Sequence, residues 1–135
     1  MNKGIILLVE DNPDDILLTQ RALKRANILN DVVIARDGIE ALQYLRCQGD
    51  FESRKDNSLP VVILLDLNMP RMGGQECLKE IRSDNALKSL PVVILTSSSE
   101  DQDIMESYNL GANSYIRKPV DFDQFVKAIQ TLGLY

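Results

Sequence analysis

The sequence contains the run VVILLD at residues 61–66, in which five consecutive apolar residues precede an aspartate. An uninterrupted apolar run of this length predicts a strand that is buried on both faces, as in a parallel sheet. Similar runs lie at 5–9 and 92–95, and weaker ones lie at 32–35 and 114–116. The sequence therefore predicts five short strands.

A helix-like segment follows each predicted strand. The first begins at Asn12-Pro13, a cap residue followed by proline at the first helical position, and continues to about Ala26. The other four helices are expected after Asp37-Gly38, after Gly74, after 98–101 with a stop at Gly111, and over 122–132, where apolar residues recur at helical spacing.

Five strand–helix units predict a single α/β domain over residues 1–135, with no output domain. Parallel strands need crossover connections, which the helices supply with right-handed geometry. We expect a flavodoxin-like (βα)5 three-layer sandwich whose five-stranded parallel sheet has the order 2-1-3-4-5, with ligands at the carboxyl ends of the strands. The polar segment 50–60 is expected to be an irregular loop.

Composition narrows the possible functions. The 135 residues are 44% hydrophobic and carry 15 Lys and Arg against 20 Asp and Glu, a net charge of −5. This acidity argues against nucleic-acid binding, and the lack of histidine excludes His-dependent nucleophiles and His-ligated zinc. Cys47 and Cys77 form no CxxC pair and are expected to be small buried hydrophobic residues. No stretch has the length of a signal or membrane segment, so we expect a cytoplasmic protein with no membrane partner.

Polar residues follow the predicted strands at one end of the sheet. Glu10 and Asp11 end the first, Asp66 ends the third, Thr96 ends the fourth, and Lys118 follows the fifth. Like charges about 4 Å apart at an effective dielectric near 20 repel by about 4 kcal/mol, so three clustered carboxylates favour a bound cation. Hard oxygen ligands in a partly open site suit Mg²⁺.

A carboxylate, a divalent ion, a lysine and a hydroxyl together form a site for a transferring phosphoryl group, with Asp66 as the nucleophile and Lys118 and Thr96 assisting. Each residue alone also has a plain structural interpretation. Asp66 and the acids at 10–11 suit turns or helix caps, Lys118 suits a solvated surface, and Tyr115 suits strand packing. Independent accidents would not place all these groups at one end of one sheet.

These residues resemble the signature of response-regulator receiver domains, the CheY-like family of two-component signalling. The resemblance rests on four motifs in order, and it covers the chain from Ile5 to the last helix. The motifs are Glu10-Asp11, Leu65-Asp66 with Met69-Pro70, Thr96-Ser97 and Lys118-Pro119. The patterns at 37–42 and 107–113, with the polar insertion before the third strand, look most like single-domain regulators that partner phytochrome-type sensor kinases.

The resemblance implies a role for each residue. Asp66 is the phosphoacceptor and a metal ligand, Asp11 binds Mg²⁺ directly, Glu10 binds it through water, and the backbone carbonyl of Asn68 supplies a further ligand. Glu10 replaces the commoner aspartate of the family.

Other implied roles concern the phosphoryl group and the signal. Thr96 hydrogen-bonds the phosphoryl group, Lys118 forms an ion pair with it, and Tyr115 turns inward as Thr96 is drawn to the phosphate. The phosphoryl group comes from the phosphohistidine of a sensor histidine kinase, including phytochrome-type kinases, or from a phosphotransfer protein. Output goes to another protein or to a homodimer formed through the face of the fourth helix, fifth strand and fifth helix. The domain promotes only its own phosphorylation and dephosphorylation and is not a turnover enzyme.

Two other functions fit parts of the pattern. A haloacid-dehalogenase-like phosphatase also uses Asp, Thr or Ser, Lys and Mg²⁺, but it needs a second aspartate two residues after the nucleophile, where this chain has Asn68. A flavin or nucleotide carrier can share the fold, but the chain has neither a GxxxxGK nor a GxGxxG loop.

Overall fold

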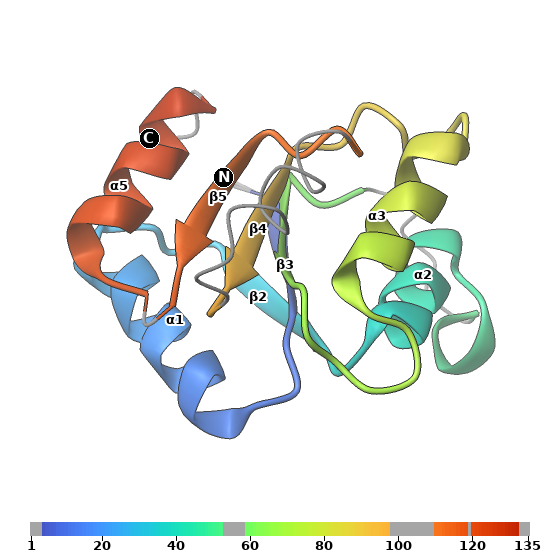
Figure 1. The fold of residues 1–135 in the computed structure, drawn as a ribbon, viewed down its shortest axis with the longest axis horizontal. Coiled ribbons are helices and arrows are strands. Elements are labelled where there is room, and N and C mark those ends of the chain that lie inside the picture. The colour runs from blue at the N-terminus through green and yellow to red at the C-terminus, as the bar shows by residue number, and fades with distance from the viewer. Residues whose placement is uncertain (1–3, 53–58, 98–109, 119, 133–135) are drawn as a thin grey trace.

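The computed structural model describes residues 4–52, 59–97, 110–118 and 120–132. Its centre is a five-stranded, all-parallel sheet in the order β2-β1-β3-β4-β5 (Figure 1). The strands are β1 (Ile5–Val9), β2 (Asp31–Ala35), β3 (Val62–Asp66), β4 (Val92–Thr96) and β5 (Ser114–Arg117). The predicted strand order is confirmed, and the predicted bounds differ by about one residue.

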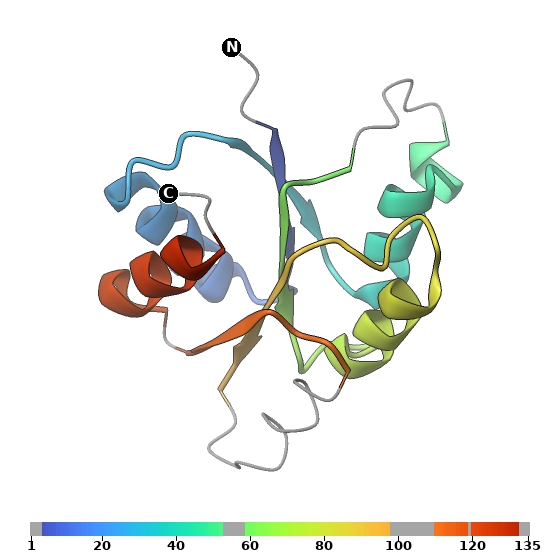
Figure 2. The same cartoon turned by 90° about the horizontal axis from the view of Figure 1, so that it is seen from above.

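Helices cover both faces of the sheet. Figure 2 shows α1 (Pro13–Arg25) and α5 (Phe122–Thr131) on one face, and α2 (Gly38–Arg46) and α3 (Gly74–Ser83) on the other. The helix predicted after 98–101, with its stop at Gly111, falls largely on residues that lie outside the described part of the chain, since 98–109 are not described. The three-layer α/β architecture is confirmed, and none of the described helices is both long and apolar enough for a membrane span.

Each central strand contributes side chains to two cores. Leu7 and Ile63 pack in the core beneath α2 and α3, while Leu8 and Leu64 pack in the core beneath α1 and α5. All four side chains are fully buried. Because consecutive strand residues face opposite sides, the continuous apolar runs serve both cores at once.

Side-chain caps set the start of the helices nearest to the predicted site. Asn12 Oδ1 accepts hydrogen bonds from the backbone N–H groups of Asp14 and Asp15, at 2.9 and 3.2 Å, and Pro13 occupies the first helical position of α1. Asp37 Oδ1 caps α2 by accepting from the N–H of Glu40 at 2.9 Å. These caps fix where the chain turns at the end of β1 and of β2.

Two local predictions are wrong in part. The irregular loop predicted at 50–60 overlaps at its start a short 3-10 helix, η1 (Gly49–Phe51), in which the Phe51 ring packs edge-on against Tyr44 with centroids 5.2 Å apart. Residues 53–58 of that segment lie outside the described part of the chain. Cys77 is buried as expected, but Cys47 is only half-buried. Cys47 is the C-cap of α2 and has a left-handed backbone (φ 54°). A residue at a helix end of this kind is not placed in the core by its apolar character alone.

Candidate functional site

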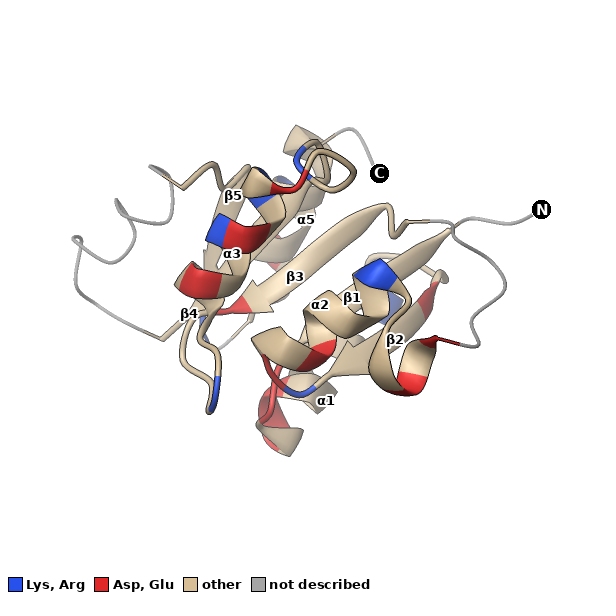
Figure 3. Cartoon of the chain, turned by 90° about the vertical axis from the view of Figure 1, so that its right-hand side faces the viewer, with Lys and Arg blue, Asp and Glu red and all other residues tan. Residues whose placement is uncertain are grey.

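Three carboxylates meet at the carboxyl ends of β1 and β3. Oxygen atoms of Glu10, Asp11 and Asp66 all lie within 4.8 Å of one another. Glu10 and Asp66 are almost fully buried, and Asp11 is half-buried. In Figure 3 acidic segments lie at the end of β3 and at the start of α1, on the same edge of the sheet. The predicted convergence of these three acids is therefore present.

Lys118 supplies the positive charge next to this acidic cluster of Glu10, Asp11 and Asp66. Its Nζ lies 2.6 Å from Glu10 Oε2 and 3.1 Å from Asp66 Oδ1. The lysine follows β5 directly, and its backbone N–H donates to the carbonyl of Thr96 at 2.8 Å. Because its side chain is only 9% exposed, the ammonium interacts with these carboxylates under weak solvent screening.

Burial and the mutual charges shift the ionisation of these groups. Burial raises the pKa of Glu10 from 4.5 to about 7, although the hydrogen bond with Lys118 opposes the rise. Burial also raises the pKa of Asp66, against the lowering effect of the Lys118 charge. For Lys118, burial alone would lower the pKa, but the hydrogen bond with Glu10 and the charge of Asp66 raise it above its usual value. The ammonium therefore stays charged, while the neighbouring carboxyl groups of Glu10 and Asp66 bind a proton more readily than usual.

The donor atoms suit a hard divalent cation. Glu10 Oε2 and Asp66 Oδ1 are both buried, and Lys118 Nζ lies within ion-pair distance of both, at 2.6 and 3.1 Å. A bound cation stabilises buried carboxylate oxygens of this kind. The donor atoms of the cluster are all oxygen, and the half-buried Asp11 leaves room for water ligands. The residues present thus fit a hard divalent cation.

The other predicted site residues have distinct placements. Thr96 is fully buried at the end of β4 and lies beside β5 in the sheet. Tyr115, on β5, is 42% exposed and is not part of the acidic cluster. Asn68 lies two residues beyond Asp66 on the exposed loop that leads to α3. Thr96 and Lys118 are connected through the backbone hydrogen bond, whereas Tyr115 lies outward.

The loop between β3 and α3 is braced against the start of α2. Arg71 has a left-handed backbone (φ 61°), and its guanidinium contacts Asp37 Oδ2 at 2.5 and 2.6 Å. The N–H of Gly38 donates to the carbonyl of Met72 at 3.0 Å. The loop that follows Asp66 is therefore held at two points by the β2–α2 connection.

Sequence reasoning missed Asp15 and the Arg71–Asp37 pair. Lys118 Nζ also donates to Asp15 Oδ2, at 3.0 Å, from the first turn of α1. One signal was available for Asp15: it is an acid at the third position of α1, a helix that begins two residues after Asp11. Acids at that position usually interact favourably with the helix dipole, so the sequence alone gives no reason to expect a contact with Lys118.

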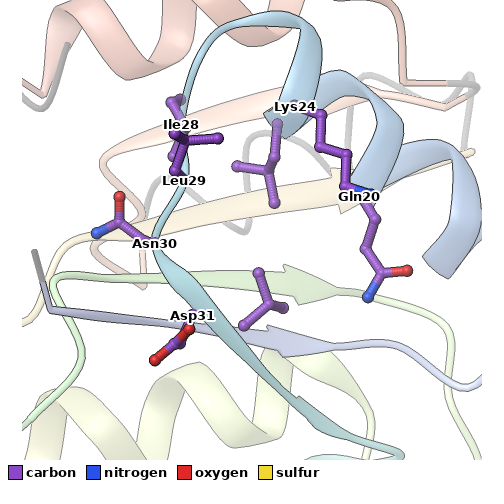
Figure 4. A pocket seen from close by; sticks show the side chains of 8 residues that line it. Gln20, Lys24, Ile28, Leu29, Asn30 and Asp31 are labelled. Carbon is purple, nitrogen blue, oxygen red and sulfur yellow. The ribbon is translucent and has the colours of Figure 1, made fainter.

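A cavity of about 360 Å³ lies at the opposite end of the sheet (Figure 4). It is lined by the end of α1, the connection that follows it and the start of β2, including Lys24, Leu29 and Asp31. Flavins and nucleotides bind at the carboxyl ends of strands in this fold, and this cavity is at the amino end of β2. It gives no support to the carrier function.

Comparison with known proteins agrees with this geometry. Residues 6–130 match the family described as the response regulator receiver domain. Response regulator Rcp1 of Synechocystis sp. is 40% identical over 126 residues, which are 93% of this chain and 84% of Rcp1. The crystal structure of the Mn²⁺-bound form of Rcp1 covers 97% of this chain and 94% of its own, with a TM-score of 0.81 and 39% identity.

Two further solved structures are similar over nearly the whole chain. The bacteriophytochrome response regulator RtBRR is 50% identical with a TM-score of 0.90, covering 100% of this chain and 80% of RtBRR. The phosphorylated cyanobacterial phytochrome response regulator RcpA is 44% identical with a TM-score of 0.78, covering 97% of this chain and 90% of RcpA. The chain therefore belongs to the response regulator receiver domain family and serves phosphorylation-based signalling in two-component systems.

Proposed function

We propose that Asp66 is the residue that accepts the phosphoryl group in this receiver domain. Members of the family are phosphoacceptors that bind a divalent metal, not classical enzymes. The observation that carries the proposal is the position of Asp66, at the end of a buried central strand, 3.1 Å from Lys118 Nζ and within a cluster of three acids. A rigid strand holds the nucleophile while one ammonium stays beside it.

The proposed metal is Mg²⁺. Asp11 and Asp66 would hold it through carboxylate oxygens, the backbone carbonyl of Asn68 would add a ligand, and Glu10 would bind through water. When bound, the ion neutralises charge on the phosphoryl oxygens. The buried carboxylate oxygens of Glu10 and Asp66 support this assignment, and the Mn²⁺-bound form of Rcp1 is a related structure with a divalent ion.

The chain's own residues can then perform the transfer. A carboxylate oxygen of Asp66 attacks the phosphorus of a phosphohistidine, so that an O–P bond forms while the P–N bond breaks and the imidazole leaves. The Lys118 ammonium, already 3.1 Å from Asp66 Oδ1, pairs with a phosphoryl oxygen. The Thr96 hydroxyl donates to another. In this proposal the domain promotes its own phosphorylation and hydrolysis through positioning and electrostatics.

The proposed output is a surface change at β5. Thr96 is buried and Tyr115 is 42% exposed on the neighbouring strand, so movement of the hydroxyl toward phosphate would free space for the ring to turn inward. The face of β5 and α5 would then bind a downstream protein or a second copy of the chain.

The proposed donor is a sensor histidine kinase of phytochrome type, or a phosphotransfer protein. Support comes from RtBRR and RcpA, whose names describe phytochrome response regulators and which are 50% and 44% identical to this chain. The free thiols of Cys47 and Cys77 suit a reducing compartment, so the proposal includes a cytoplasmic location.

Phosphorylation of single-residue variants tests the acceptor. Acetyl phosphate with Mg²⁺ should modify the wild-type protein, and Asp66→Asn should show no modification because an amide is a poor nucleophile. Asp31→Asn, an exposed change at the start of β2, is the matched control and should behave like the wild type. Modification of Asp66→Asn at the wild-type level, in a protein with a native circular dichroism spectrum, would refute the proposal.

A further inference from the structure

Lys118 has a third carboxylate partner that lies outside the acidic cluster. Its Nζ donates to Asp15 Oδ2 at 3.0 Å, besides forming ion pairs with Glu10 and Asp66. Among the described residues, the acids grouped closely enough to hold a cation are Glu10, Asp11 and Asp66. One ammonium is therefore shared between this cluster and helix α1.

The backbone of Asp15 is firmly placed for this contact. Asp15 is the third residue of α1, its N–H donates to Asn12 Oδ1 at 3.2 Å, and its carbonyl accepts from Thr19 Oγ1 at 2.9 Å. Its side chain is 26% exposed, whereas that of Lys118 is 9% exposed. Asp15 thus reaches Lys118 from α1, while Glu10 and Asp66 reach it from the ends of β1 and β3.

This arrangement creates a competition for one positive charge. A cation at the acidic cluster competes with Lys118 for Glu10 and Asp66, whereas a phosphodonor anion attracts Lys118. Negative charge on Asp15 draws the ammonium toward α1, which favours the cation and disfavours the anion. Loss of that charge should therefore have opposite effects on the two kinds of ligand.

We propose that Asp15 is a positioning residue that holds part of the Lys118 charge away from the acidic cluster, and so sets the balance between cation binding and phosphodonor binding. The inference rests on the proposed function for the role of the anion. It concerns how Lys118 is shared between Asp15 and the acidic cluster. It adds to the site Asp15, a residue that the sequence motifs do not include.

The experiment compares Asp15→Asn with Asp14→Asn. Asparagine keeps an oxygen acceptor at position 15 and removes only the charge. Asp14 lies on the same first turn of α1 with an exposed side chain, so its variant loses the same net charge and the same favourable interaction with the helix dipole. Differences between the two variants therefore report the contact with Lys118.

Two measurements are made on each purified full chain. Calorimetric titration with Mn²⁺ alone should show an affinity about fivefold lower in Asp15→Asn, the size typical of a partly exposed charge pair. The acetyl phosphate concentration that gives half the maximal phosphorylation rate, at saturating Mg²⁺, should fall by about the same factor, with little change in the maximal rate. Asp14→Asn should stay within about twofold of the wild type in both.

The direction of the two shifts decides the outcome. Weaker Mn²⁺ binding together with a lower half-maximal acetyl phosphate concentration, in Asp15→Asn and not in Asp14→Asn, supports the inference. Weaker binding of both ligands would indicate a purely structural role and overturn it, as would unchanged values. If acetyl phosphate fails to modify even the wild type, the expectation that a small phosphodonor phosphorylates this domain is wrong, and the Mn²⁺ titration then decides the Asp15 inference alone, with equal affinities overturning it.

Discussion

At the residue scale, the chemistry depends on how Lys118 is surrounded. Its ammonium lies within 3.1 Å of three carboxylates, one directly after β1, one on α1 and one at the end of β3, and its side chain is nearly buried. Removing one partner from a buried ion pair leaves the other uncompensated, so the residues of this group depend on one another. The carboxylates still outnumber the ammonium, which is why the group favours either protons or a cation.

Glu10 predicts a pH dependence for the metal-free protein. Its pKa is about 7 when folded and about 4.5 ordinarily, so the folded state binds more protons between these values. The free energy of unfolding should therefore fall as the pH rises from about 4.5 to 7, by about 1–3 kcal/mol, and level off above this window. Urea denaturation at pH 5 and pH 8 in the presence of EDTA measures the fall.

Two controls accompany this titration. Mg²⁺ prefers the ionised carboxylates, so adding it should reduce the fall between pH 5 and pH 8. Glu10→Gln is neutral at every pH and should show a smaller fall than the wild type, with the rest due to Asp66, whose pKa burial also raises. An equal fall in wild type and Glu10→Gln would contradict the role assigned to Glu10.

Residue-scale prediction from sequence succeeded where a side chain follows a strand. Glu10, Asp11, Asp66 and Lys118 each come directly after or at the end of a strand, so strand order alone brings them together. Asp15 belongs to a helix, and its contact with Lys118 depends on where α1 lies relative to the residues that follow β5, which no local sequence pattern contains. Long-range ion pairs of this kind are set by tertiary packing.

At the element scale, the β3–α3 connection needs a close approach of two backbones. A Cβ atom at Gly74 would collide with the backbone carbonyl oxygen of Asp66 and come within 2.8 Å of Leu67 Cα. The N–H of Gly74 also donates to the carbonyl of Leu67 at 3.0 Å. The first residue of α3 is therefore packed directly against the residue that we propose as the acceptor.

Gly74→Ala should both destabilise the protein and slow its phosphorylation. The added methyl group must displace backbone at Asp66, an overpacking that costs about 1–3 kcal/mol of unfolding free energy. Gly73→Ala is the matched change one residue earlier, where the Cβ would meet only the carbonyl oxygen of Leu67, at 3.2 Å, and should have a smaller effect. Urea denaturation and the acetyl phosphate rate measure both, and equal losses would contradict the close approach at Gly74.

Elements with a strong local sequence pattern could be predicted, whereas an element that depends on a tertiary contact could not. The apolar runs of β1, β3 and β4 needed no tertiary information, because burial on both faces leaves an uninterrupted pattern. The 3-10 helix η1 ends at Phe51, whose ring packs edge-on against Tyr44. That contact depends on where α2 ends, at the left-handed Cys47, and lies beyond the reach of periodicity.

At the scale of the whole molecule, the fold separates two ends of one sheet. Every strand runs in the same direction, so the acids, the lysine and the threonine share the carboxyl end, while the cavity beside Leu29 and Asp31 lies at the other. Parallel topology converts scattered sequence positions into one site. This is why strand order was sufficient to predict the location of the site.

Chemical mapping of the modified residue identifies the phosphoacceptor without reference to any variant. Borohydride reduces an acyl phosphate on aspartate to homoserine, so the full chain is treated with acetyl phosphate and Mg²⁺, reduced, digested and sequenced by mass spectrometry. We expect homoserine at position 66 and aspartate at position 11. Homoserine at position 11, or none at position 66 in protein that has taken up phosphate, would contradict it.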